Sequence, residues 1–249
     1  MSRNSFLAVF NQKAALSIFL IGKLLRFFFF FGFIVFLLKG TKSLAGYNLN
    51  QTLLFFLTFN LIDTVSQFLF REVYRFRPLI ISGGFDLVLS KPMSALFRSL
   101  MGGADVIDLI TIVPLGAATF YVAHLLNPSF TQSVFYLLLL INGLIIASAF
   151  HIFVLGLGIV TYEIDHTIMI YRDLFNLGRF PIDIYKEPLR GIITFLIPIG
   201  IMVSFPVKAI MGLMSPLGVI WSLAFGILVL ILSFKFWNFA LKKYTSASS

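Results

Sequence analysis

The sequence has 249 residues, of which 59% are hydrophobic and 12% are charged, and it carries a net charge of +9 at pH 7. Soluble domains carry roughly 25% charged residues, so this composition excludes a soluble globular protein and indicates an integral membrane protein. The chain contains no cysteine, which excludes disulfides and thiolate metal sites. In such a chain the distribution of basic residues matters more than their number, and we expect no nucleic-acid partner.

Six apolar segments are long enough to span a hydrocarbon core about 30 Å thick. They cover approximately residues 24–38, 52–70, 107–126, 134–160, 191–207 and 217–237. We therefore predict an all-α integral membrane protein with six transmembrane helices, organised as one domain over residues 1–249.

The beginning of the first span is open. Residues 5–20 either extend this span or form an amphipathic helix at the membrane surface. If they extend it, we expect Lys23 and Arg26 to reach toward the lipid headgroups.

The basic residues predict the orientation of the chain. Of the 19 Lys and Arg residues, all but Lys39, Lys42 and Lys208 fall on the side that would hold both termini and the loops 71–98 and 161–190. Because cytoplasmic loops retain Lys and Arg, both termini are predicted to be cytoplasmic in a bacterial-type inner membrane.

Two prolines interrupt the fifth apolar segment. Pro198 and Pro206 should kink or break it, because proline removes a helical hydrogen bond. Residues 206–214 then read as a short helix at the outer face, where protein or a cavity must satisfy its backbone.

Two polar residues inside spans are candidate pathway residues. Asp63 lies about 10 Å from the cytoplasmic end of the second span, and His151 lies in the fourth. Polar groups in a bilayer are costly, and they often mark a transport pathway. The alternative for each is packing, with Asp63 hydrogen-bonded to Thr58, Ser66 or a neighbouring helix, and with His151 a satisfied packing residue.

Two carboxylates stand three residues apart at the beginning of the third span. Asp105 and Asp108 share one helical face, and a helix N-terminus favours anions. We expect them to form an interfacial cap, with Arg98 as a partner.

The loop 71–98 is the longest polar interval and contains Ser82-Gly83-Gly84, which is similar to the signature loop of ATP-binding cassette (ABC) ATPases. An ATPase domain needs about 100 residues or more, and the sequence contains no G-x-x-x-x-G-K-[ST] loop. The chain is therefore predicted to have no ATPase site and not to be an enzyme.

The same loop predicts a short helix over residues 74–81, broken by the flexible pair Gly83-Gly84. Phe76, Leu79, Ile80 and Phe85 lie outside any span. We expect these side chains to lack a core within the chain, so that lipid headgroups or a partner protein would cover them.

Two strings carry a resemblance to a known family: FREVYRFRPLIISGGFDLVLSKPMSALF and, over residues 175–212, FNLGRFPIDIYKEPLRGIITFLIPIGIMVSFPVKAIMG. They are similar to ABC-2-type permeases, the membrane subunits of ABC exporters, and the resemblance covers nearly the whole chain. The string TYEIDHTIMIYRD is more polar than the family pattern, so the end of the fourth span is not defined by the sequence.

The resemblance implies a permease that works by alternating access as a dimer with an identical or different second permease, surrounded by membrane lipid. It also implies two copies of a separate ABC ATPase that bind ATP and Mg²⁺, with no cofactor on the permease itself. It further implies that the loop after the second span holds a coupling helix for the ATPase. The residues that would form it are Arg75, Phe76, Arg77, Leu79, Ile80, Ser82, Gly83, Gly84, Phe85 and Asp86.

Two other classes remain open from the sequence. One is an ion-coupled secondary transporter or channel, in which Asp63 and His151 would be central, and the other is a membrane scaffold without transport. A copurifying ATPase favours the permease, and gradient-driven flux without an ATPase favours the second class. The absence of both favours the scaffold.

Overall fold

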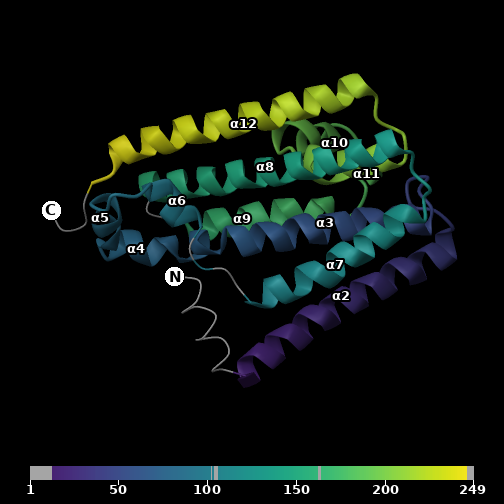
Figure 1. Ribbon diagram of the computed structural model, residues 1–249, viewed down its shortest axis with the longest axis horizontal. Helices are drawn as coiled ribbons and strands as arrows, with labels where there is room; N and C mark the ends of the chain where they lie inside the picture. The colour runs from purple at the N-terminus through teal and green to yellow at the C-terminus, as the bar shows by residue number, and fades with distance from the viewer. Residues whose placement is uncertain (1–12, 102, 104–105, 162–163, 246–249) are drawn as a thin grey trace.

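The computed structural model describes residues 13–101, 103, 106–161 and 164–245, and its long helices lie side by side (Figure 1). Five helices in this part of the chain are long and apolar enough to cross a membrane. They are α2 (Lys13–Thr41), α3 (Leu49–Leu69), α7 (Val106–His124), α8 (Phe130–Thr161) and α12 (Pro216–Lys243). The predicted all-helical membrane protein is confirmed at this level, and residues 13–20 extend the first span.

Local sequence signals set the beginnings of two of these helices. Asn48 accepts a hydrogen bond from the Gln51 amide, and the Gln51 side chain accepts one from the Asn48 amide, which forms a capping box before α3. Ser215 accepts a hydrogen bond from the Gly218 amide, and Pro216 occupies the first turn of α12.

Short helices gather at one end of the bundle, beside the C-terminal ends of α8 and α12 (Figure 1). They are the 3₁₀ turn η1 (Arg71–Arg75), α4 (Phe76–Ile81), α5 (Gly84–Leu89) and α6 (Ala95–Leu100). Gly83 has a φ of +70°, a left-handed conformation that suits glycine and turns the chain between α4 and α5. The predicted short helix and its break at Gly83-Gly84 are confirmed, and this end is called the α4–α6 end below.

The helix α9 (Asp165–Asn176) changes the predicted path of the chain. It lies alongside α3 and α8 (Figure 1) and continues into the 3₁₀ turn η2 (Leu177–Arg179). Asp165 accepts a hydrogen bond from Arg77 at 3.2 Å at the α4–α6 end. Ten residues later, Phe175 stacks on Phe59 in the middle of α3, with ring centroids 4.9 Å apart.

The segment after η2 reaches the opposite end of the bundle. Asp183, in the 3₁₀ turn η3 (Ile182–Ile184), accepts hydrogen bonds from the Tyr47 hydroxyl at 3.0 Å and from Lys208 Nζ at 2.9 Å. Tyr47 lies in the turn between α2 and α3. Burial and the Asp183 carboxylate raise the pKa of the Tyr47 phenol, so it stays a hydrogen-bond donor at neutral pH.

The chain therefore passes from one end of the bundle to the other between Asp165 and Asp183. The prediction that the whole interval 161–190 lies on one side is wrong, because Lys186 and Arg190 follow Asp183 at the far end. The α9 sequence contains Arg172 and Asp173. These charges lower its hydropathy, so hydropathy alone does not identify α9 as a crossing segment.

The predicted fifth span over residues 191–207 is a bent pair of short helices, with a bend of 77° between Leu189–Leu196 and Gly200–Ile210. Its pieces are α10 (Leu189–Gly191), the π-helical turns η4 (Ile192–Leu196) and η5 (Gly200–Ser204), and α11 (Phe205–Ile210). The break includes Pro198, as predicted, whereas Pro206 fits in the first turn of α11.

The two ends of this pair lie together. Arg190, at the beginning of the pair, and Lys208, near its end, line one small pocket, which also contains Asp183. The second arm packs against α8, where a Cβ atom added to Gly143 would lie 2.6 Å from the Met202 carbonyl oxygen. The pair is thus a re-entrant hairpin whose backbone is covered by protein, as such irregular segments require. The end of the bundle that holds it is called the α11 end.

Cysteine labelling tests this path, because the natural chain has no cysteine. Lys186→Cys and Ser43→Cys occupy exposed positions at the α11 end, and Ser90→Cys is exposed at the α4–α6 end. We expect an impermeant thiol reagent to label Lys186→Cys and Ser43→Cys from the same side of intact cells, and Ser90→Cys only after permeabilisation. Labelling of Lys186→Cys together with Ser90→Cys would show that α9 does not cross.

Candidate functional site

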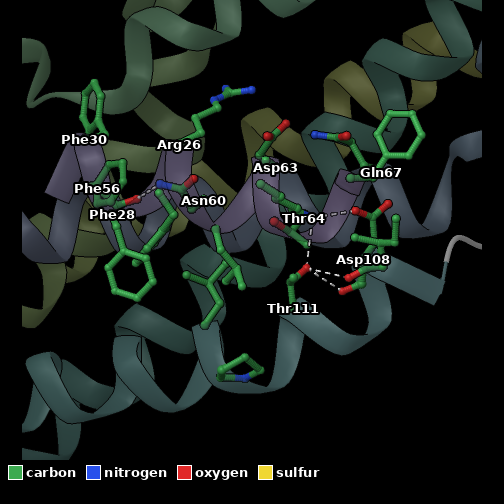
Figure 2. Close-up of a pocket in the computed structure, with 18 of the residues that line it drawn as sticks. Arg26, Phe28, Phe30, Phe56, Asn60, Asp63, Thr64, Gln67, Asp108 and Thr111 are labelled. Carbon is green, nitrogen blue, oxygen red and sulfur yellow. Dashed lines mark hydrogen bonds and ion pairs between the residues drawn. The ribbon is translucent and has the colours of Figure 1, made fainter. Parts of the chain in front are cut away.

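A cavity of about 820 Å³ lies between α2, α3 and α7, within the range of ligand-binding pockets (Figure 2). Each helix contributes residues at helical spacing. On α3 these residues are Asn60, Asp63, Thr64 and Gln67, which form one polar stripe that Arg71 of η1 continues. A polar stripe on a spanning helix must face protein or water, and here it faces the cavity.

The facing wall comes from α2. Phe19, Lys23, Arg26, Phe27 and Phe30 recur at the same helical spacing and line the cavity. Polar and aromatic positions therefore share one face of α2, although most of that helix is apolar.

An ion pair joins α2 to α7 at the cavity wall. Lys23 Nζ donates hydrogen bonds to Asp108 Oδ1 at 2.7 Å and to the Thr111 hydroxyl at 2.9 Å. The Asp108 side chain is only 6% exposed. The expectation that Lys23 reaches the headgroups is wrong, because a carboxylate within the protein is its partner.

The expected partnership of Arg98 with the carboxylates of the third span is also wrong for Asp108. Arg98 donates to Glu72 Oε1 at 2.9 Å, within the 71–100 segment. Asp105 lies outside the described residues.

Two guanidinium groups reach the cavity from α9 and η2. Arg172 lies 6.0 Å from the Tyr74 ring centroid, and Arg179 lies 5.5 Å from that of Phe30. These distances fit cation–π contacts. Asp63 is within electrostatic reach of Arg172 and Arg26.

Neither Thr58 nor Ser66 is the hydrogen-bond partner of Asp63 among the described residues. The Thr58 hydroxyl lies 3.0 Å from the Tyr136 hydroxyl, and the buried Ser66 hydroxyl has no partner in the part of the chain described. Asp63 instead lines the cavity and interacts with Gln67, one helical turn away.

His151 lies outside this cavity, so the structure does not bring the two candidate pathway residues to one site. Its Nδ1 atom lies 2.8 Å from the Ala147 carbonyl oxygen, and its ring packs on Phe70 and Tyr171 with centroids 4.9 and 5.2 Å away. The packing interpretation of His151 fits this environment.

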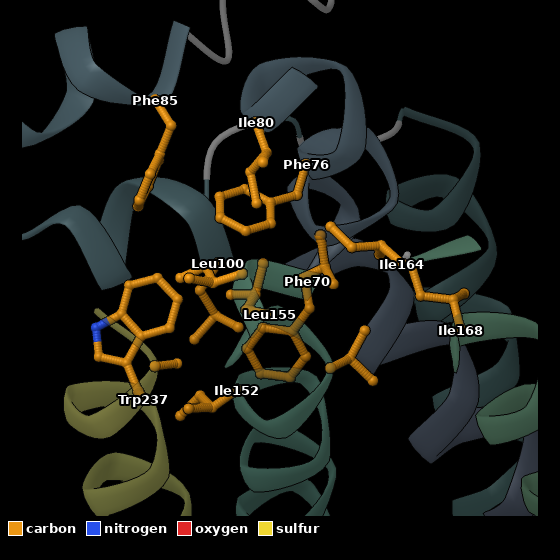
Figure 3. Packing of buried hydrophobic residues seen from close by; sticks show 14 of the residues in the cluster. Phe70, Phe76, Ile80, Phe85, Leu100, Ile152, Leu155, Ile164, Ile168 and Trp237 are labelled. Carbon is orange, nitrogen blue, oxygen red and sulfur yellow. The ribbon is translucent and has the colours of Figure 1, made fainter. Parts of the chain in front are cut away.

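The apolar residues of the 71–100 segment have a core of their own. Phe76, Ile80 and Phe85 are each no more than 1% exposed, and they pack with Trp237 of α12 and Leu155 of α8 (Figure 3). The expectation that these side chains lack an intrachain cover is wrong. Phe76 and Ile80 are four residues apart in α4, so both face the same side, toward α8 and α12.

The opposite side of the segment is exposed. Large apolar side chains there have between 41% and 67% of their surface exposed. They are Ile81, Leu87, Leu89, Met93 and Phe97, which we name the exposed apolar set. Leu79, Gly84 and Asp86 are partly buried, and Ser82 is exposed.

The long apolar helices indicate a multi-pass membrane protein. Residues 24–248 match the family model described as ABC-2 family transporter protein. The chain therefore belongs to the ABC-2 transporter family, as its resemblance implied. Neither a curated protein nor a solved structure matches it significantly.

Proposed function

We propose that this chain is the permease subunit of an ATP-driven ABC exporter, with ATP and Mg²⁺ bound by a separate ATPase. The single observation that carries this proposal is the family match over residues 24–248. Two permease chains, identical or different, would pair with two ATPase copies and work by alternating access. The single-domain organisation and the inner-membrane location are part of the same proposal.

The 71–100 segment is the proposed coupling element, with its residues divided between two tasks. Its exposed apolar set would enter a groove of the ATPase, because burial of one such side chain contributes about 1.5–3 kcal/mol. Arg75 and Arg77 lie at the margin, where charges mainly tune the rate of association.

The buried rings would carry the movement of the segment into the bundle. Phe76 and Phe85 contact each other edge to face, with centroids 5.1 Å apart, and both lie 6.4 Å from the Trp237 indole. Protein interiors are close-packed and transmit displacement. A push on α5 would therefore reach α12 directly.

Basic residues support a cytoplasmic α4–α6 end and cytoplasmic termini. That end holds Arg71, Arg75, Arg77, Lys91, Arg98, Lys242 and Lys243, whereas the α11 end holds Lys39, Lys42, Lys186, Arg190 and Lys208. The bias is smaller than the sequence alone implied, because Lys186 and Arg190 change sides, but its sign is unchanged.

Affinity purification from the native membrane in mild detergent tests both levels of the proposal. We expect the natural chain to copurify with an ABC ATPase, and Ile81→Ser combined with Leu87→Ser to reduce the retained ATPase about tenfold, since two apolar anchors are lost. The control is Leu213→Ser, an equally exposed apolar position at the α11 end.

The outcomes separate the alternatives. Undiminished ATPase in the double variant would exclude the exposed apolar set as the docking site. Absence of any ATPase from the natural complex would overturn the permease proposal, and gradient-driven flux in that preparation would then establish the ion-coupled class.

A further inference from the structure

The cavity between α2, α3 and α7 has an excess of basic groups. Lys23, Arg26, Arg71, Arg172 and Arg179 line it, together with the carboxylates Asp63 and Asp108. The Asp108 charge is already matched by Lys23 at 2.7 Å.

Besides Arg71, three guanidinium groups line the cavity. Within the described residues, Arg26, Arg172 and Arg179 form no ion pair with a carboxylate at 4.0 Å or less. Among the described residues of the wall, Asp63 is the one carboxylate besides Asp108. A basic group within membrane depth is costly unless a counter-charge stabilises it, so the cavity favours an anion. Guanidinium groups bind phosphate and carboxylate in a bidentate manner, which suits an anionic headgroup.

The cavity is amphipathic along the membrane normal. Gln67 in the last turn of α3 and Arg71 in η1 lie nearest the α4–α6 end, and Asp108 lies in the first turn of α7. Farther from that end the wall becomes apolar. Rings of Phe27 and Phe30 pack on Phe56, with centroids 5.3 and 4.8 Å away.

The direction of this gradient matches one leaflet. A lipid in the leaflet at the α4–α6 end places its headgroup at that surface and its tails toward the bilayer midplane. The polar end holds the Lys23–Asp108 pair. Arg179 marks the boundary with the aromatic part, because its guanidinium lies 5.5 Å from the Phe30 ring centroid and 5.6 Å from that of Phe59. A soluble anion has no apolar part to bury against the aromatic rings, and a neutral lipid has no charge to pair with the three guanidinium groups.

We propose that this cavity binds an amphiphile with a compact anionic headgroup, phosphate or carboxylate, drawn from the leaflet at the α4–α6 end. The headgroup lies between Arg26 and Arg172, with Arg179 at the boundary between headgroup and tail. The tail lies against Phe27, Phe30 and Phe56. The proposal rests on the proposed function, because it names the substrate class of the permease. Asp63 limits the positive potential, so the bound anion can leave again.

Photolabelling of the full chain tests this binding. The protein is placed in nanodiscs of zwitterionic phosphatidylcholine with a phosphatidic acid analogue that carries a diazirine near the end of its acyl chain. A phosphatidylcholine analogue with the same chain and diazirine is the matched probe. Because charge-assisted bonds to the headgroup are present only for the anion, we expect about tenfold more adducts on the aromatic wall with phosphatidic acid.

Variants test the groups that hold the headgroup. Arg172→Gln combined with Arg179→Gln should reduce labelling by phosphatidic acid about tenfold. The two Lys replacements should give intermediate labelling, because they keep the charge but lose the bidentate geometry. Asp63→Asn should increase it, which a residue with only a packing role would not do. Arg190→Gln, at the α11 end and paired with Glu187 at 2.8 Å, is the control and should change nothing.

Competition in the natural protein keeps the test independent of variant folding. Unlabelled short-chain phosphatidic acid and dodecyl phosphate should both displace the probe. Stronger displacement by phosphatidic acid would indicate a phospholipid, and stronger displacement by dodecyl phosphate would indicate a single-chain amphiphile. Inorganic phosphate should not displace it. Equal labelling by the two probes, adducts only outside the cavity, or displacement by inorganic phosphate alone would overturn the proposal.

The ATPase takes no part in this assay. Failed labelling in a protein that still retains its ATPase would remove the substrate class and leave the permease assignment intact. Specific labelling in a protein without an ATPase would support the binding site and remove the permease assignment.

Discussion

Phe76→Ala is expected to lower the free energy of unfolding of the α4–α6 end by about 3–5 kcal/mol, the usual cost of truncating a buried phenylalanine. The Phe76 ring is 1% exposed and lies between Phe85, Ile80 and Trp237 (Figure 3). Alanine would leave a cavity where the short helices meet α12. Because these helices are attached to the bundle mainly by this cluster, the loss should appear as local opening.

A single reporter thiol measures that opening. Ser99 is 1% exposed on α6, and its hydroxyl has no partner among the described residues, so Ser99→Cys is a tolerable replacement in a chain without cysteine. We expect Phe76→Ala to increase the reactivity of this thiol by about two orders of magnitude or more. Leu87→Ala, at a position 67% exposed, should change the reactivity little. Equal reactivity in both variants would show that the ring cluster does not hold the segment.

This result bears on mechanism, because the coupling residues implied by the resemblance divide into two groups. Loss of Phe76 should impair coupling by loosening the segment, while loss of Leu87 should impair it by weakening ATPase binding in a folded segment. A permease that retains its ATPase but has lost stimulated hydrolysis would thus identify the buried rings as transmitters.

The secondary structure of the coupling segment was predictable from sequence, but its burial was not. Gly83-Gly84 marked the break, and a helix from Phe76 to Ile81 lies within the predicted range. The spacing of Phe76 and Ile80 was a sign of an inward face. Its cover comes from Trp237 and Leu155, which are distant in sequence, so local pattern alone does not identify it.

The fifth crossing was assigned to the wrong segment for a physical reason. Hydropathy favours Gly200–Ile210 and disfavours α9, which carries Arg172 and Asp173. The charged α9 is tolerable because it packs on α3 and α8 and contributes Arg172 to a polar cavity. The second arm of the hairpin, Gly200–Ile210, is apolar and covered by protein, whereas Phe195 and Leu196 of the first arm are exposed.

The sequence around Asp63 contains a pattern that indicates the cavity. Asn60, Thr64 and Gln67 lie on the same face of α3 as Asp63, and Arg71 follows at the same spacing. Such a stripe predicts a polar environment inside the membrane. The identity of the facing helices, and the contribution of Arg179 from a segment more than one hundred residues away, depend on the tertiary arrangement.

Lys23→Met is expected to destabilise the protein by about 3 kcal/mol, near the lower end of the range for breaking a buried ion pair. The Asp108 side chain, 6% exposed, would lose its partner at 2.7 Å, and its Oδ2 atom already has no partner within the described chain. Lys23 is partly exposed, with 33% of its side-chain surface accessible, which reduces the loss. Chemical denaturation in detergent, followed by helical circular dichroism, measures the change.

A double-mutant cycle separates the ion pair from the packing of the two side chains. Lys23→Met combined with Asp108→Leu should recover most of the stability, because no uncompensated charge remains and apolar groups of similar volume replace the pair. Lys39→Met, at an exposed position on the same helix, is the control and should stay within about 0.5 kcal/mol of the natural protein. If the double variant is as unstable as Lys23→Met, the charge pair is not the cause. If recovery occurs, the pair fixes α2 against α7 at the polar end of the cavity, and Lys23 is thereby excluded from direct neutralisation of a bound anion.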